Sequence, residues 1–166
     1  MLVEEVSSEF AKTFLDAYHP LQSGGATKGA LVNFAGYSDD LKWPVFVAVF
    51  VYPRSRWKHY PVSLELSRLA WSPLAKRSAS TFLRKCLRLL RRQGHTGLVV
   101  TYALPGTSGV VYERAGFRQD GHSSGASWSV RGPGERPTPN TIGDKVRLKR
   151  FFASLASGGT DVRGAQ

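Results

Sequence analysis

Cysteine is almost missing from this chain of 166 residues, which contains Cys86 alone. A single cysteine excludes an intrachain disulfide and a zinc site built from several cysteines. Long apolar runs are missing too, because no stretch approaches the roughly 20 residues that a membrane helix needs. The first residues offer Glu4 and Glu5 where a signal peptide would carry basic residues. The sequence therefore predicts a soluble protein of the cytoplasm, with no membrane partner.

Acidic residues are scarce: 12 Asp and Glu stand against 23 Lys and Arg, and the formal net charge is +11. A charge of this size predicts polyanionic partners, such as nucleic acid or phosphorylated cofactors. Hydrophobic residues make up 42% of the chain. At this length that is enough for one compact domain with its own core.

The hydrophobic pattern predicts an α/β (α+β) domain. Ser7 or Ser8 can cap a first helix that ends near His19. Further helices are expected over two segments, 79–93 and 108–116. Apolar runs and two-residue alternation predict strands over residues 31–36, 45–52, 62–71 and 98–103 and around 117–121. A helix joins the third strand to the fourth, so those two strands are expected to be parallel.

The last 36 residues differ from the rest, because turn-forming residues precede a basic stretch and a polar tail. We expect residues 1–130 to form the domain and 131–166 to form a basic C-terminal extension, partly loop or disordered. The sequence does not predict the oligomeric state.

The turn before the second helix is a candidate anion site. A helix N-terminus has unpaired N–H groups and the positive end of the helix dipole. Ser78, Ala79 and Ser80 are small enough for the backbone to approach a phosphate, and Lys76 and Arg77 add charge. A Ser-capped surface helix with solvated basic residues has the same composition. The turn alone leaves both interpretations open.

Three segments resemble the core of the GNAT acyltransferases: LAWSP, LVVTYA and SGVVYERAGF. A basic turn and a helix follow the first of these segments. VYERAGF is similar to the Tyr-x-x-x-Gly-Phe signature that closes this fold. The resemblance implies a GNAT-like mixed central sheet flanked by helices, with the coenzyme A diphosphate of acetyl-CoA at residues 76–80 and Tyr112 near its thiol. It also implies that Leu69, Ala70 and Trp71 lie beside the cofactor.

Three longer segments are similar to the phage Mom-type DNA modification proteins, a divergent GNAT-like group. They are LELSRLAW, RSASTFLRKCLRLLR and VTYALPGTSGVVYERAGF. This resemblance covers roughly residues 18–130. It implies a DNA-modifying enzyme that uses acetyl-CoA to modify the adenine amino group of double-stranded DNA by carbamoylmethylation, and so protects phage DNA from restriction in the infected bacterium. Iron is implied as a possible metal, without ligands in this chain.

Three residues are candidates for the chemistry. The phenol of Tyr112 could protonate a leaving thiolate, or could belong to the core. Glu65 lies among apolar strand residues, where burial would make its carboxylate a better base, although an outward-facing glutamate is common. Ser108, beside Thr107, could bind the cofactor or base, but capping of the following helix is favoured. The metal ligands are unknown, since the spacing of His19, His59, Asp120 and His122 matches no metal motif.

Nucleic acid contacts are predicted where basic and aromatic residues interleave, a pattern suited to phosphate binding and base stacking. A solvated hairpin explains the same pattern equally well. The strand residue Arg68 is a weaker candidate, because regular alternation places it on the face opposite Glu65 unless a bulge intervenes. The full predicted set is Arg54, Arg56, Trp57, Lys58, His59, Tyr60, Arg68, Lys145, Arg147, Lys149 and Arg150.

Two other functions fit the same residues. The chain could be a GNAT N-acetyltransferase acting on an amine of another modified base, a small molecule or a protein. It could also be a non-catalytic DNA-binding module that keeps the fold without turnover.

Overall fold

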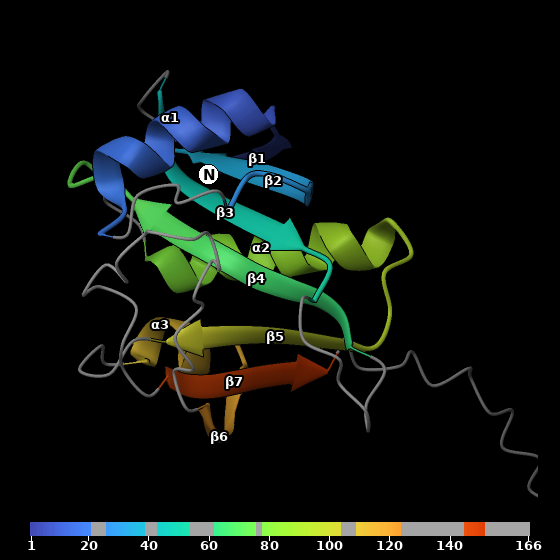
Figure 1. Cartoon of the computed structure of the whole chain (residues 1–166). Coiled ribbons are helices and arrows are strands. Elements are labelled where there is room, and N and C mark those ends of the chain that lie inside the picture. Colours follow the sequence, from blue (N-terminus) through green and yellow to red (C-terminus); the bar gives the residue numbers. More distant parts are fainter. Residues whose placement is uncertain are drawn as a thin grey trace, which may run out of the picture.

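The computed structural model of the chain describes residues 1–20, 26–38, 43–53, 62–75, 78–103, 109–123 and 145–151. Seven strands form one sheet in the order β1-β2-β3-β4-β5-β7-β6, with helices on both faces (Figure 1). The elements are β1 (Leu2–Glu5), α1 (Ser8–Tyr18), β2 (Ala30–Tyr37), β3 (Pro44–Val51), β4 (Val62–Trp71), α2 (Ala79–Arg92), β5 (Leu98–Ala103), α3 (Val110–Arg114), β6 (Arg118–Ser123) and β7 (Lys145–Phe151).

The sheet is mixed. β1 to β4 form an antiparallel meander, and β4 then pairs with β5 in parallel. α2 makes the crossover between these parallel strands, as the sequence predicts. The central strands β3 and β5 are continuous apolar runs because both faces of the sheet are covered there.

β7 comes from the segment predicted as a C-terminal extension. It is antiparallel to both β5 and β6 and lies between them in the sheet. This part of the extension therefore belongs to the sheet, although no strand was predicted there. β1 was also not predicted, because four residues at the chain start give too short a pattern.

α1 covers one face of the sheet and packs over β2, β3 and β4 (Figure 1). The Ser7 hydroxyl accepts a hydrogen bond from the Phe10 backbone N–H at 3.1 Å, which caps the helix as predicted. Ala11, Phe14 and Leu15 are buried against the sheet. None of the helices in the described segments is long and apolar enough to cross a membrane.

α2 and α3 cover the opposite face. The apolar stripe of α2 is buried in the larger core cluster, where Phe82 stacks on Phe46 with ring centroids 5.2 Å apart. α3 is shorter than the segment 108–116 predicted for it, and its N-cap is Gly109 with φ 60°. Thr107 and Ser108 lie outside the described residues, so the prediction that one of their hydroxyls caps this helix stays a prediction. Only glycine adopts this φ without strain, which explains the choice of residue.

Candidate functional site

The parallel strands β4 and β5 separate at one end of the sheet. β5 pairs with β4 from Val62 to Leu66, but β4 continues along β3 as far as Trp71. From Ser67 to Trp71, β4 pairs with no strand of the described residues on its β5 side. At about 3.3 Å per residue this open edge is roughly 16 Å long. We call this opening the fork; along it, the backbone groups of β4 on the β5 side belong to no strand pair of the described residues.

A hydrogen-bonded chain stands at the base of the fork. The Thr101 hydroxyl donates to the Leu66 carbonyl oxygen at 3.0 Å, and the same hydroxyl is hydrogen bonded to the phenol of Tyr112. Because Thr101 has one hydroxyl proton and gives it to Leu66, the neutral phenol must be the donor to Thr101. Tyr112 therefore reaches from α3 to the last pair of residues that join β4 and β5.

The Tyr112 side chain is half-buried and packs edge-on against Phe117, with ring centroids 6.1 Å apart. Burial raises the pKa of the phenol above its ordinary value, and the hydrogen bond with Thr101 partly opposes this rise. Thr101 can oppose it by turning its hydroxyl toward a phenolate once the proton has left. Tyr112 thus keeps its proton at neutral pH and has a partner for the ionised form.

A β-bulge arranges the other face of the fork. Glu65 lies opposite Val51 and Arg68 lies opposite Val49, so Ser67 is an extra residue in β4. The bulge brings Glu65 and Arg68 to the same face, the one that α1 covers. Without it, residues three apart in a strand would point to opposite faces. The bulge that the sequence analysis left open is therefore present, and it unites two predicted site residues.

His19, at the C-cap of α1, belongs to this face as well. Burial, followed by the charge of Arg68, lowers the pKa of its imidazole from 6.5 to about 4. His19 is therefore neutral at pH 7 and close to the Arg68 guanidinium. Tyr102 lies on the same face two residues beyond Val100, the residue that pairs with Glu65. The fork thus has Tyr112 on one side of the sheet and Glu65, Arg68 and His19 on the other.

The lowered pKa of His19 predicts a loss of stability in mild acid. The unfolded chain binds a proton at His19 near pH 6.5, while the folded chain binds it only near pH 4. Stability should therefore fall as the pH drops through this window, by about 1 to 2 kcal/mol. The full shift would give roughly 3 kcal/mol, but water around the half-exposed ring screens the charge of Arg68.

Urea unfolding of wild type and His19→Gln from pH 7 to pH 4.5 measures this effect. The difference between the two proteins should narrow as the pH falls, because only wild type loses the contribution of His19. His95→Gln, at a half-buried histidine beyond the end of α2, is the matched control and should follow wild type. A constant difference between wild type and His19→Gln would contradict the prediction.

The N-terminus of α2 lies just beyond the open edge of β4. Ser78 is the N-cap, and its hydroxyl accepts from the Thr81 backbone N–H at 3.3 Å and contacts the Ser80 hydroxyl at 2.7 Å. No described residue accepts from the backbone N–H groups of Ala79 and Ser80. The Arg84 guanidinium donates to the Thr81 hydroxyl at 3.2 Å, which adds a positive charge to this first turn. Two donors and a cation are therefore available to an anion.

The connection from β4 to α2 is anchored at its start. Buried Ser72 donates its backbone N–H to the Val45 carbonyl at 2.9 Å, and its hydroxyl accepts from the Leu74 N–H at 3.3 Å. These bonds fix where the chain leaves β4. Among the strand residues predicted to lie beside a cofactor, Leu69 and Ala70 are buried and Trp71 is 46% exposed.

Several predicted site residues fall outside the described residues. They are Lys76 and Arg77 of the anion turn, Ser108, and the basic-aromatic segment 54–60. Lys145, Arg147, Lys149 and Arg150 are placed by their backbone on β7. The roles predicted for all of these residues remain predictions.

The described residues contain no group of three or more His, Cys, Asp or Glu that could hold a metal ion. They therefore offer no fit for the iron implied by the resemblance. Cys86 is fully buried in the core, where burial raises the pKa of its thiol, so it has a packing role.

Three features of this region were not predicted from the sequence. Thr101 was not considered, because its contacts with Leu66 and Tyr112 join segments far apart in the chain. Arg84 was not singled out as a site residue, although its guanidinium lies at the first turn of α2. The third is an apolar groove of about 780 Å³ beside α1, to which Phe10, Phe14, Tyr18, Trp43 and Leu74 contribute.

Solved structures with similar folds include several acetyltransferases. The ribosomal-protein-S18-alanine N-acetyltransferase of Escherichia coli matches 95% of this chain and 97% of its own, with a TM-score of 0.65 and 12% identity. A Bacillus subtilis acetyltransferase in complex with CoA matches 90% and 97%, at TM-score 0.61 and 14% identity. A GNAT family acetyltransferase from Elizabethkingia anophelis with acetyl-CoA bound matches the same shares, at TM-score 0.61 and 11% identity.

The sequence matches no protein-family model and no curated protein. At such low identities the structural likeness establishes the fold, and the chain has the fold of the GNAT acetyltransferases. The predicted fold class, a mixed sheet flanked by helices in a single domain, is confirmed.

Proposed function

We propose that this chain is an acyltransferase-like enzyme that uses acetyl-CoA to modify the adenine amino group in DNA. One observation carries the proposal: a phenol, an open strand edge and a helix N-terminus follow one another along the fork. Tyr112 stands at its base, residues 67–71 of β4 form its edge, and Ala79 and Ser80 lie beyond its outer end. This order matches the thiol, pantetheine and diphosphate of coenzyme A.

The diphosphate would bind at the first turn of α2. The N–H groups of Ala79 and Ser80 and the guanidinium of Arg84 would donate to its oxygens, and the helix dipole favours negative charge there. Lys76 and Arg77 would add positive charge from the preceding turn. The usual family pattern places glycines here, and this chain has Ser and Ala instead, which are small enough to leave the N–H groups accessible.

The pantetheine arm would bind along the open edge of β4. Its two amides can hydrogen bond to backbone groups of an unpaired strand, as an added strand would. Leu69, Ala70 and Trp71 lie on this stretch, with β3 already paired on the other edge. The arm would therefore occupy the place that β5 leaves when it separates from β4.

The chemistry would take place at the base of the fork. Acetyl-CoA supplies an activated acyl group and a sulfur that leaves as a thiolate. Tyr112 would give that sulfur a proton, with Thr101 ready to stabilise the phenolate. Glu65, from the α1 side, would accept the proton of the attacking amino group. The acid would thus act from one face of the sheet and the base from the other, on a thioester held where β4 and β5 separate.

DNA is the proposed acceptor because the chain carries a net charge of +11. An amino group inside a stacked duplex is out of reach, so the base would have to be flipped out or lie in an unpaired strand. Residues 54–60 and the basic residues of β7 are proposed to hold the DNA, and Arg68 to contact the flipped nucleotide. The reaction would take place in the cytoplasm of a phage-infected bacterium.

Replacing Ala79 by proline tests the diphosphate site. Position 79 is the first residue of α2, where proline is tolerated, and Ser78 already has the extended ψ of 137° that a residue before proline requires. The substitution removes one N–H donor. We expect affinity for acetyl-CoA to fall roughly 10- to 100-fold, since hydrogen bonds to charged groups contribute about 1.5–3 kcal/mol.

Isothermal titration with acetyl-CoA measures this loss, and melting without ligand shows whether the variant folds. S-acetylpantetheine, which lacks the diphosphate, is the matched control ligand and should bind wild type and Ala79→Pro equally. An equal loss for both ligands would mean that the substitution disturbs the fork itself. No loss for either ligand would place the diphosphate elsewhere.

Mass analysis of nucleosides from DNA co-expressed with the protein tests the function as a whole. A modified adenine nucleoside is expected, and its mass identifies the group added. If acetyl-CoA binds but the DNA stays unmodified, the acceptor is a different amine. If the chain binds DNA and not acetyl-CoA, it is a binding module without turnover.

A further inference from the structure

α2 presents a row of arginines to solvent. Arg84, Arg88, Arg91 and Arg92 are all exposed, and their spacing of three and four residues places them on one side of the helix. We call these four residues the arginine face. The opposite side of α2 is buried in the core. The helix contains no acidic residue at all.

The arginine face is electrostatically unfavourable by itself. Like charges four residues apart repel each other, and Arg84 lies near the positive end of the helix dipole. Within the described part of the chain, no carboxylate forms an ion pair with any of the four. Arg84 donates to Thr81, which is a neutral partner. A polyanion bound outside the helix would relieve this repulsion.

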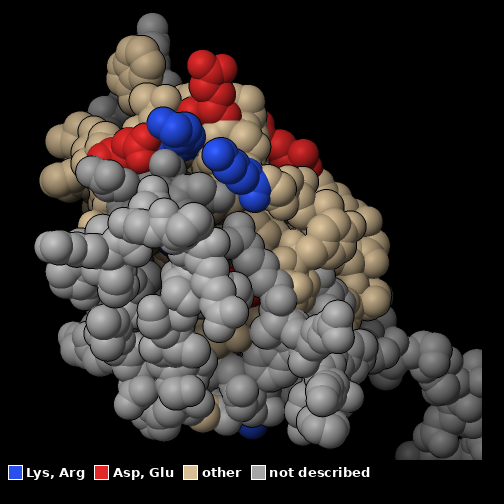
Figure 2. Space-filling model, in the orientation of Figure 1, with Lys and Arg blue, Asp and Glu red and all other residues tan. Residues whose placement is uncertain are grey.

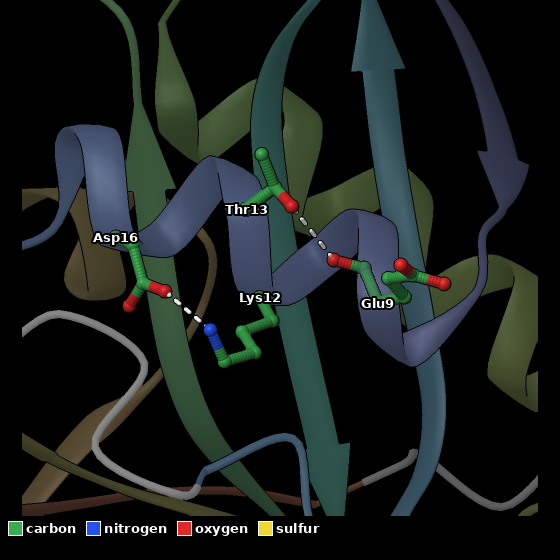
Figure 3. Close-up of polar contacts among 4 residues, drawn as sticks. All are labelled: Glu9, Lys12, Thr13 and Asp16. Carbon is green, nitrogen blue, oxygen red and sulfur yellow. Dashed lines mark hydrogen bonds and ion pairs between the residues drawn. The ribbon is translucent and has the colours of Figure 1, made fainter.

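α1, on the other face of the sheet, differs from α2 in its surface charge. Its outer side mixes the two signs: Lys12 pairs with Asp16 at 2.9 Å, and Glu9 lies one turn earlier (Figure 3). Acidic and basic side chains likewise lie among one another on the face shown in Figure 2. A solvated helix usually has this mixed composition. The unmixed charge of α2 is therefore a property of that helix and does not follow from general solubility.

We propose that the arginine face binds the phosphate backbone of double-stranded DNA. From Arg84 to Arg92 the helix rises about 12 Å, which covers about three to four phosphates of one strand at 3.4 Å of duplex axis each. Contacts of this kind position the duplex without reading its sequence. The choice of DNA among polyanions rests on the proposed function, while the surface itself does not depend on catalysis.

The salt dependence of binding tests this surface. The full chain is titrated with several unrelated DNA duplexes between 50 and 200 mM salt, without acetyl-CoA, and log K is plotted against log[salt]. Each phosphate contact contributes about 0.9 to the slope. The triple variant Arg88→Gln/Arg91→Gln/Arg92→Gln should therefore lose about 2.7 of the slope, equally for all sequences. Arg84 is left in place because it also lies at the first turn of α2.

The matched control removes the same charge elsewhere, at exposed Lys12, Lys28 and Arg118, each replaced by Gln. Its slope should change by less than about 1. Equal changes of slope in both triple variants would show that only net charge matters. An unchanged slope in the α2 variant would mean that DNA binds elsewhere. Either result overturns the proposal. The proposal would also be overturned if the α2 variant bound DNA normally but no longer bound phosphatidylserine vesicles.

Failure of this proposal differs from failure of the proposed function. Normal DNA modification with an unchanged salt slope would contradict the arginine face alone. Absence of acetyl-CoA binding with the expected slope would contradict only the enzyme. The α2 variant should melt no lower than wild type, because the substitutions remove repulsion from exposed positions.

Discussion

Replacing Tyr112 by phenylalanine should slow modification of DNA about 100- to 10,000-fold, the range that a positioned general acid contributes. Phenylalanine keeps the ring that packs against Phe117 and removes only the hydroxyl. The leaving sulfur then has no proton donor at the base of the fork. Affinities for DNA and acetyl-CoA should stay nearly unchanged, so the loss should appear in kcat.

Initial rates of nucleoside modification, measured by mass spectrometry at saturating acetyl-CoA, provide this comparison. Tyr37→Phe is the matched control, because Tyr37 is also half-buried but lies on β2, away from the fork. Its rate should equal that of wild type. Equal rates for wild type and Tyr112→Phe would remove Tyr112 from the mechanism while leaving the cofactor site intact.

The pH dependence of wild type supplies a second readout for the same residue. Burial raises the pKa of the Tyr112 phenol, so the acid form persists above neutral pH. Activity that depends on this proton should hold into the alkaline range and fall only where the phenol ionises. If the residual activity of Tyr112→Phe also falls at alkaline pH, this fall is caused by the ionisation of another group.

The sequence predicted the central elements well because their signals are local. β4 and β5 have the predicted bounds, and α2 ends one residue before its predicted end. Continuous apolar runs, a two-residue period and a helical stripe each appear within about ten residues. The N-cap Ser7 was predictable for the same reason.

The geometry of the site was not predictable, because it depends on pairing between distant segments. The bulge at Ser67 exists only relative to β3, so regular alternation placed Arg68 on the wrong face. The contact of Thr101 with Tyr112 joins β5 to α3 across the end of the fork. β7 does have an alternating pattern, with Val146 and Leu148 among basic residues, but its position between β5 and β6 follows only from the sheet.

Replacing Phe82 by alanine should destabilise the chain by about 3–5 kcal/mol, a large part of the 5–15 kcal/mol typical of a domain. Phe82 is fully buried at 0% exposure and stacks on Phe46. Its removal leaves a cavity between α2 and the sheet that backbone neighbours cannot fill. Urea unfolding measures the loss, and Phe10→Ala, at a half-buried phenylalanine of α1, should cost clearly less.

The ring of Phe82 also explains why residue 36 is glycine. A Cβ at Gly36 would lie 2.6 Å from Cδ2 and 2.8 Å from Cε2 of Phe82, closer than carbon atoms can approach. Gly36→Ala alone should therefore cost about 1–3 kcal/mol through overpacking. In the Phe82→Ala background the added methyl group enters vacated space, so the same change should cost much less. Additive losses in this double-mutant cycle would show that α2 is not held against β2 by this contact, and the placement of its N-terminus beside the fork would then depend on other core residues.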